Sequence, residues 1–206
     1  MNSTNSIVRE VDKATSCPPK LPPDARRQLR GLYTVDALVA WAYGRAEAVT
    51  AGEFMTMACQ MDGDEGPWLL YSLRDQLTPE ALRLTGFIWS GAEYPDRELE
   101  ASVWLEMFEA GGYTHDGQPA ERPKEPIRLY RGSVADRRLN WSWTERIEVA
   151  EKFAAGDRRG RPLGKVWTAE VEPWRLLCRN DDRSEAEFVI NTEGLHVEEW
   201  EGNTGE

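Results

Sequence analysis

The sequence predicts an α+β protein that is helical in its first half and rich in strands in its second. Apolar residues recur at helical spacing between residues 25 and 110, whereas short runs of β-branched and aromatic residues follow residue 126. The chain has 206 residues, of which 40% are hydrophobic. That suffices for one sizeable core, or for a core with a smaller helical attachment. The pattern is compatible with two domains and with one α+β unit.

The first 24 residues are expected to form a poorly ordered arm. They are polar, and the run CPPKLPP at 17–23 cannot sustain a helix or a central strand, because proline lacks a backbone N–H. Asp24 is a candidate N-cap for a helix that follows this arm.

Residues 25–113 form the predicted helical region. Within it, Thr78 followed by Pro79 is typical of a helix start, since threonine caps the first turn and proline fits the first helical position. A last helix is expected from about 97 to 109, with the pair Gly111-Gly112 ending it.

The β-rich part spans residues 127–200 and follows a connector, 114–126, that is rich in glycine, proline and charge. Its apolar runs predict strands, which we place at 127–131, 165–171 and 185–190. Between the first two, residues 145–155 have apolar members at helical spacing, and Thr144 is the expected N-cap of that helix.

The composition excludes several classes of protein. A net charge of -11 repels phosphates, so general nucleic-acid binding is not expected. No run of about 18 apolar residues predicts a membrane span, and the polar N-terminus does not resemble a secretion signal. Three widely spaced cysteines and two histidines predict neither a disulfide framework nor a metal site, and they fit a reducing cytoplasm.

The β-rich part carries a cation and a pair of hydroxyls at strand-like segments. Arg131 offers a permanently charged, planar fork of donors to phosphate oxygens, and Gly132 beside it lets a ligand approach the backbone closely. Ser142 and Thr144 are two residues apart, so on a strand their hydroxyls share one face and could hold a carboxylate in place. Each feature alone also has an ordinary explanation, as a surface salt bridge or a helix cap.

Two carboxylates, Glu185 and Glu187, complete this set. Being two residues apart, they project to one face if the segment is extended, and their burial without partners would be costly. Such a pair could serve the cleavage of a glycosidic bond in a dinucleotide. Glu187 could stabilise the oxocarbenium ion that forms and bind a ribose hydroxyl, while Glu185 could orient or deprotonate the nucleophile. The ordinary explanation is a solvated edge strand in an acidic protein.

In this order, the residues resemble the Arg–Ser–Glu class of mono-ADP-ribosyltransferases, the group related to cholera toxin and the clostridial binary toxins. The resemblance covers roughly residues 127–198. The segment LYRG at 129–132 is similar to that family's first strand, WSWT at 141–144 to its Ser-Thr-Ser strand, and SEAE at 184–187 to its Glu-x-Glu turn. AEKFA at 150–154 is similar to the Ala-x-x-Phe-Ala segment that commonly follows the Ser-Thr-Ser strand.

Three departures from the family's pattern stand out. Threonine occupies position 144 where the family usually has serine, and Trp143 replaces the middle threonine. Ser142 follows Arg131 by only 11 positions, so the intervening NAD-binding loop and helix are abbreviated.

The resemblance implies a split β core of two sheets with flanking helices, on which residues 25–113 pack as an accessory region. It implies NAD as the substrate, nicotinamide as the leaving group, and a macromolecular acceptor of ADP-ribose. The implied catalytic residues are Glu187 and Glu185, and the implied NAD-binding residues are Arg131, Gly132, Ser142, Thr144 and Tyr130. In that family a glutamate at position 185 goes with transfer to a protein arginine.

Two other functions remain compatible with the sequence. One is an NAD glycohydrolase acting as a toxin or defence effector, because Glu185 would equally activate water. The other is a non-catalytic module that binds a nucleotide or a protein. The segments at 104–106 and 141–154 also resemble uncharacterised small proteins of actinobacteria and their phages, which fits a phage effector that acts in the host cytoplasm.

Overall fold

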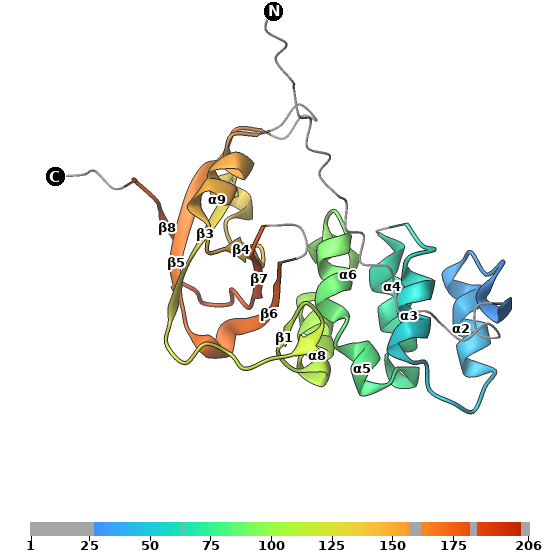
Figure 1. Ribbon diagram of the computed structural model, residues 1–206. Coiled ribbons are helices and arrows are strands. Elements are labelled where there is room, and N and C mark those ends of the chain that lie inside the picture. The colour runs from blue at the N-terminus through green and yellow to red at the C-terminus, as the bar shows by residue number, and fades with distance from the viewer. Residues whose placement is uncertain (1–26, 63, 157–161, 182–184, 203–206) are drawn as a thin grey trace, which may run out of the picture.

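The computed structural model describes residues 27–62, 64–156, 162–181 and 185–202 (Figure 1). The predicted arm at 1–24, the cap at Asp24 and Ser184 lie outside the described residues. Helices occupy one half of the molecule and a sheet the other, with α6 (Thr85–Gly91) next to the sheet strand β6 (Leu176–Asn180). In the described part of the chain, no helix has the length and apolar character to cross a membrane.

Three helices of the helical half begin at a threonine that caps them. Thr34 and Thr50 accept hydrogen bonds from the first turns of their helices, and Thr78 caps a helix with Pro79 at its first position, as the sequence predicts. The helices other than α6 are α2 (Val35–Tyr43), α3 (Ala51–Ala58), α4 (Glu65–Leu73), α5 (Pro79–Leu82), α7 (Pro95–Glu98) and α8 (Ala101–Gly111), with a 3-10 turn at Arg74–Gln76.

The single helix predicted from about 97 to 109 is wrong. Leu99 and Glu100 are extended and separate α7 from α8. This break buries the Leu99 side chain and lets the indole of Trp104 donate a 3.0 Å hydrogen bond to the carbonyl of Pro95. Gly112, at a φ of 73°, ends α8 as predicted.

The described strands form one mixed sheet in the order β2-β1-β6-β7-β4-β3-β5-β8. β1 and β2 arise in the predicted connector; each has only two residues, too few for a periodic pattern. Besides β6, the strands are β1 (Thr114–His115), β2 (Gln118–Pro119), β3 (Ile127–Ser133), β4 (Ser142–Thr144), β5 (Lys165–Val171), β7 (Glu187–Ile190) and β8 (Glu198–Glu199).

This single sheet differs from the two sheets that the resemblance implies. The described register between β3 and β4 is the one pair Tyr130–Thr144. By contrast, β3 pairs with β5 along its whole length, from Ile127 to Ser133. Among the described strand pairings, the one between β3 and β4 is therefore the shortest.

Two hydrophobic clusters lie on the sheet. The helices bury one cluster against Trp141, Leu177, Cys178 and Val189 of the β-rich part. The second contains Trp143, Phe188 and residues of β3, β5 and β6. An extended chain would place Trp141 and Trp143 on one face, but β4 begins only at Ser142, and the two indoles enter different clusters.

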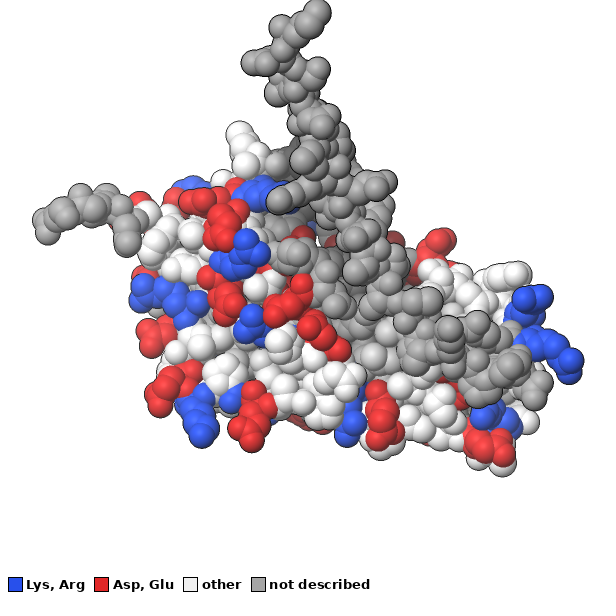
Figure 2. Space-filling view, in the orientation of Figure 1, with Lys and Arg blue, Asp and Glu red and all other residues white. Residues whose placement is uncertain are grey.

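The helix α9 (Ile147–Ala154) packs on β3, β4 and β5 (Figure 1). Charged side chains of both signs intermingle on the face shown in Figure 2, over the β-rich half. The acidic net charge is thus not gathered into a single patch on that face.

Candidate functional site

The topology brings the three candidate segments onto adjacent strands. β4 lies between β3 and β7, and the register places Tyr130 opposite Thr144 and Thr144 opposite Glu187. Glu187 in turn lies opposite Asn180 of β6. Because directly paired residues point to the same face of an antiparallel sheet, Thr144, Glu187 and Asn180 share one face.

Arg131 follows Tyr130 by one residue, so its side chain leaves β3 on the opposite face from Thr144 and Glu187, and its guanidinium reaches across to β4. Its Nη1 donates to the carbonyl oxygen of Ser142, and its Nε donates to that of Arg137 at 2.8 Å. These bonds fix the plane of the guanidinium, and the described hydrogen bonds of Arg131 do not involve its Nη2.

The guanidinium of Arg131 is desolvated although the residue keeps some exposure. Burial lowers its pKa to about 10, while the carboxylates of Asp96 and Glu187 counteract this shift. Arg131 therefore stays charged at neutral pH, and of the two carboxylates that of Asp96 contributes more to this than that of Glu187.

Glu187 is held by a residue that the sequence analysis did not select. Ser90 of α6 donates a hydrogen bond to Oε2 of Glu187. Asn180 donates in turn to the hydroxyl of Ser90 at 2.8 Å. The carboxylate is partly buried, and its anchor comes from the helical half.

Ser142 is also bonded to α6. The indole N–H of Trp89 donates to its Oγ at 3.0 Å. The Trp89 ring stacks on Trp141, with the ring centroids 5.1 Å apart, and lies edge-on to Trp104. The predicted role of the Ser142 hydroxyl, to hold a carboxylate, is not what the described bonds show.

Thr144 connects β4 to the segment before β7. The prediction that it caps the next helix is wrong, because α9 begins at Ile147 with Arg146 as its N-cap. The hydroxyl of Thr144 accepts from the backbone N–H of Arg146 at 3.1 Å and donates to the carbonyl of Glu185 at 2.6 Å. Thr144 thus holds the backbone that leads into Glu187.

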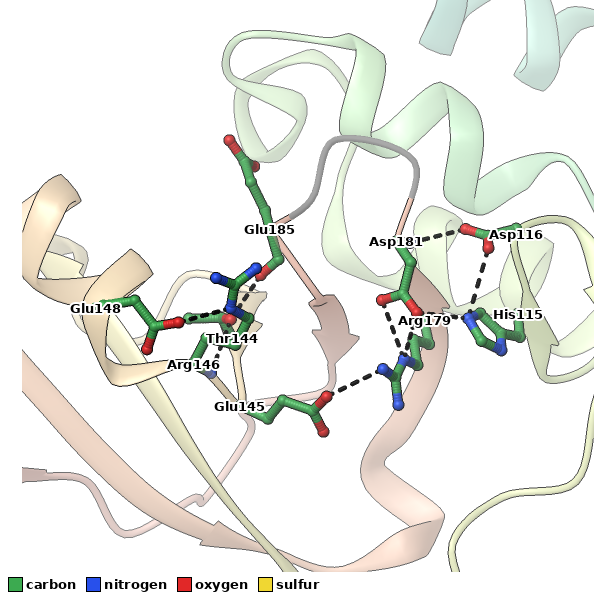
Figure 3. A network of polar contacts seen from close by, with 9 residues as sticks. All are labelled: His115, Asp116, Thr144, Glu145, Arg146, Glu148, Arg179, Asp181 and Glu185. Carbon is green, nitrogen blue, oxygen red and sulfur yellow. Dashed lines mark hydrogen bonds and ion pairs between the residues drawn. The ribbon is translucent and has the colours of Figure 1, made fainter. Parts of the chain in front are cut away.

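Glu185 and Glu187 do not lie on one strand face, because the segment is not extended throughout as that prediction requires. β7 begins at Glu187, and Ala186 has a φ of 45°, in the left-handed region that alanine rarely adopts. Figure 3 shows the carboxylate of Glu185 directed away from Thr144 and Arg146. The left-handed residue turns the chain between the two glutamates, and such strained residues cluster at functional sites.

Gly132 and Tyr130, both on β3, pack against other parts of the protein. A Cβ at Gly132 would lie 2.5 Å from the backbone nitrogen of Ala154, and closer still to the carbonyl oxygen of Ala150. Glycine is therefore needed for the close approach of α9, a role unlike the ligand approach that the sequence suggested. The ring of Tyr130 lies edge-on to Trp200, at 5.2 Å.

A second polar group lies at the same end of β6 and β7 as Glu187, just beyond Asn180 (Figure 3). His115, Asp116 and Asp181 have potential ligand atoms within 4.8 Å of one another, so they are the residues that could hold a metal ion. As they stand, Asp181 accepts from His115 at 2.9 Å and from Arg179, which also pairs with Glu145 at 3.0 Å. The hydrogen bonds from Arg179 and His115 outweigh burial and hold the pKa of Asp181 below its ordinary value.

Two cavities of about 380 and 220 Å³ lie away from Arg131 and Glu187. The larger is partly basic and is lined by Tyr113, His115, Ala120, Glu121, Arg122, Pro123, Lys124, Arg179 and Phe188. The smaller lies between the helices and is lined by Arg74, Asp75, Leu82, Glu106, Met107 and Ala110.

Comparison with known proteins yields no match to a protein-family model, a curated protein or a solved structure.

Proposed function

We propose that the protein is an NAD-dependent mono-ADP-ribosyltransferase of the Arg–Ser–Glu type, with a macromolecular acceptor. The observation that carries this proposal is the placement of Arg131, Ser142 and Glu187 on three adjacent strands, with the guanidinium of Arg131 hydrogen-bonded to the backbone of Ser142. Only one residue pair, Tyr130–Thr144, is described between β3 and β4, and there the sheet would divide into the two sheets of that fold.

The chemistry requires few groups. Arg131 would bind the pyrophosphate through its Nη2 edge, because a guanidinium matches phosphate oxygens and this one stays charged. Glu187 would stabilise positive charge on the ribose as the bond from C1 to the nicotinamide nitrogen breaks and the bond's electron pair leaves with nicotinamide. The acceptor then bonds to C1 and loses a proton, for which Glu185 is the proposed base, with a protein arginine as the proposed acceptor.

One observation favours a second function, that of a non-catalytic binding module. Oγ of Ser142 and Oε2 of Glu187 both receive hydrogen bonds from α6, so each has a partner where the helical half meets the sheet. Hydrogen bonds of this kind between a helix and a sheet are explained by packing alone, without a substrate.

Labelled NAD separates these functions and the hydrolase. The purified protein is incubated with NAD labelled in its adenylate part, with and without a cell extract. Label on macromolecules supports the transferase. Free ADP-ribose with unlabelled macromolecules means that the protein is a hydrolase, and unchanged NAD contradicts both activities.

A matched pair of arginine variants tests the NAD-binding role. Arg131→Ala should weaken NAD binding about 10- to 100-fold, as expected for the loss of charge-assisted hydrogen bonds to phosphate. Arg128→Ala removes an exposed cation from the same strand and should leave binding unchanged. Equal dissociation constants for the two variants, measured by titration calorimetry, would contradict the assignment of Arg131.

A further inference from the structure

We propose that Ser90 is a positioning residue for Glu187, so that the helical half completes the catalytic site. This inference rests on the proposed function and adds a residue to it. It concerns a contact that spans 97 positions in the sequence and joins α6 to β7.

The direction of the hydrogen bonds at Ser90 is fixed by chemistry. The Asn180 amide nitrogen lies 2.8 Å from Ser90 Oγ and 3.3 Å from the carbonyl oxygen of Gly86. A carbonyl oxygen can only accept, so the amide group of Asn180 must present its nitrogen on this side. Ser90 therefore accepts from Asn180, and its single hydroxyl hydrogen points to Glu187.

This arrangement leaves one carboxylate oxygen for the substrate. Ser90 bonds Oε2 of Glu187, which leaves Oε1 to face the ribose. Ser142, the hydroxyl that the sequence suggested for holding a carboxylate, accepts from Trp89 in the described bonds. The hydroxyl that holds the carboxylate of Glu187 is therefore that of Ser90 on α6, and not one on β4.

Packing fixes α6 in place against the sheet. A Cβ at Gly86 would lie 2.6 Å from Sγ of Cys178, so glycine allows the helix to lie directly on β6. One residue before Ser90, Trp89 is buried among the rings of Trp104, Phe108 and Trp141. Because these contacts belong to the core of the helical half, that core determines where the Ser90 hydroxyl lies.

The test is the rate of nicotinamide release by variants of the full chain, measured with a cell extract that supplies the acceptor and corrected for release by the extract alone. Ser90→Ala should lower kcat about 10- to 100-fold, the effect of losing one hydrogen bond to a charged group. KM and the dissociation constant of NAD should stay within about twofold, because Arg131 still binds the dinucleotide. Ser90→Thr keeps the hydroxyl and should restore kcat to within about threefold of the wild type.

Two further variants separate positioning from folding. Ser102→Ala removes an exposed serine of α8 and should change neither kcat nor the melting temperature. Ser90→Cys keeps the size of the side chain but donates weakly, so kcat should fall even where the melting temperature is unchanged.

Wild-type kcat in both Ser90→Ala and Ser90→Cys would overturn the inference and leave the proposed function intact. An equal loss of kcat in Ser90→Thr and Ser90→Ala would also overturn it, since a hydroxyl would then bring no benefit. Absence of nicotinamide release by the wild type itself would refute the proposed function, and the positioning role with it.

Discussion

The close approach of α9 to β3 makes Gly132 the position where the smallest substitution should have a large effect. In Gly132→Ala the new Cβ would lie within 2.5 Å of the backbone of Ala154 and closer still to that of Ala150, whereas real Cβ atoms essentially never come nearer than 3.0 Å. Both neighbours are backbone atoms, so α9 must shift as a whole. Overpacking costs about 1–3 kcal/mol, and we expect a loss at the upper end, about 3 kcal/mol.

Urea denaturation of Gly132→Ala and Gly91→Ala measures this effect. Gly91 ends α6, and a Cβ there meets no atom within 4 Å, so the same chemical change should be neutral or stabilising by up to about 1 kcal/mol. For a chain of this size, a loss of about 3 kcal/mol corresponds to a drop of about 6–12 °C in Tm. Equal unfolding free energies for the two variants would refute the packing of α9 on Gly132.

Three further predictions concern the rest of the molecule. Trp141→Ala should lower the unfolding free energy by about 3–5 kcal/mol, because its indole is buried, whereas the exposed Trp174→Ala should change it by less than about 1 kcal/mol; urea denaturation compares them. Burial raises the pKa of Glu53, but hydrogen bonds, first that from Arg45, more than offset this and hold it below 4.5. The stability that this carboxylate adds is therefore present at neutral pH and lost as the pH falls through the lowered pKa. Glu53→Gln should cost about 1–3 kcal/mol at pH 7 and progressively less as the solution is acidified; a difference independent of pH contradicts this. Burial raises the pKa of the Cys178 thiol well above its ordinary value, so peptide mapping should find it unmodified by iodoacetamide at pH 8 until the protein unfolds.

Local chemistry explains which parts of the fold the sequence predicted. The strand at 165–171 is observed with the predicted bounds, and the Thr78 cap is confirmed, because both depend on neighbouring residues alone. The break before α8 was missed, since it depends on where Leu99 and Trp104 are buried. Strands of two residues, such as β1, offer no pattern to detect.

The candidate site was predictable in its strand residues but not in its helical ones. Arg131 and Glu187 were selected from the chemistry of their side chains, and the topology places their strands either side of β4. Ser90 and Trp89 act across 97 and 53 positions, a pairing that no local pattern encodes. The one available signal was a serine within the otherwise apolar run GFIWSG at 86–91.

Nicotinamide release from NAD by the wild type and by Glu187→Gln, measured with a cell extract that supplies the acceptor, tests the central claim most directly. The substitution keeps the size of the side chain and removes only its charge, so circular dichroism and Tm should match the wild type. The account predicts release by the wild type and a fall of at least about 100-fold in the variant, as charge stabilisation of the transition state is lost. A variant that releases nicotinamide at the wild-type rate would contradict the account.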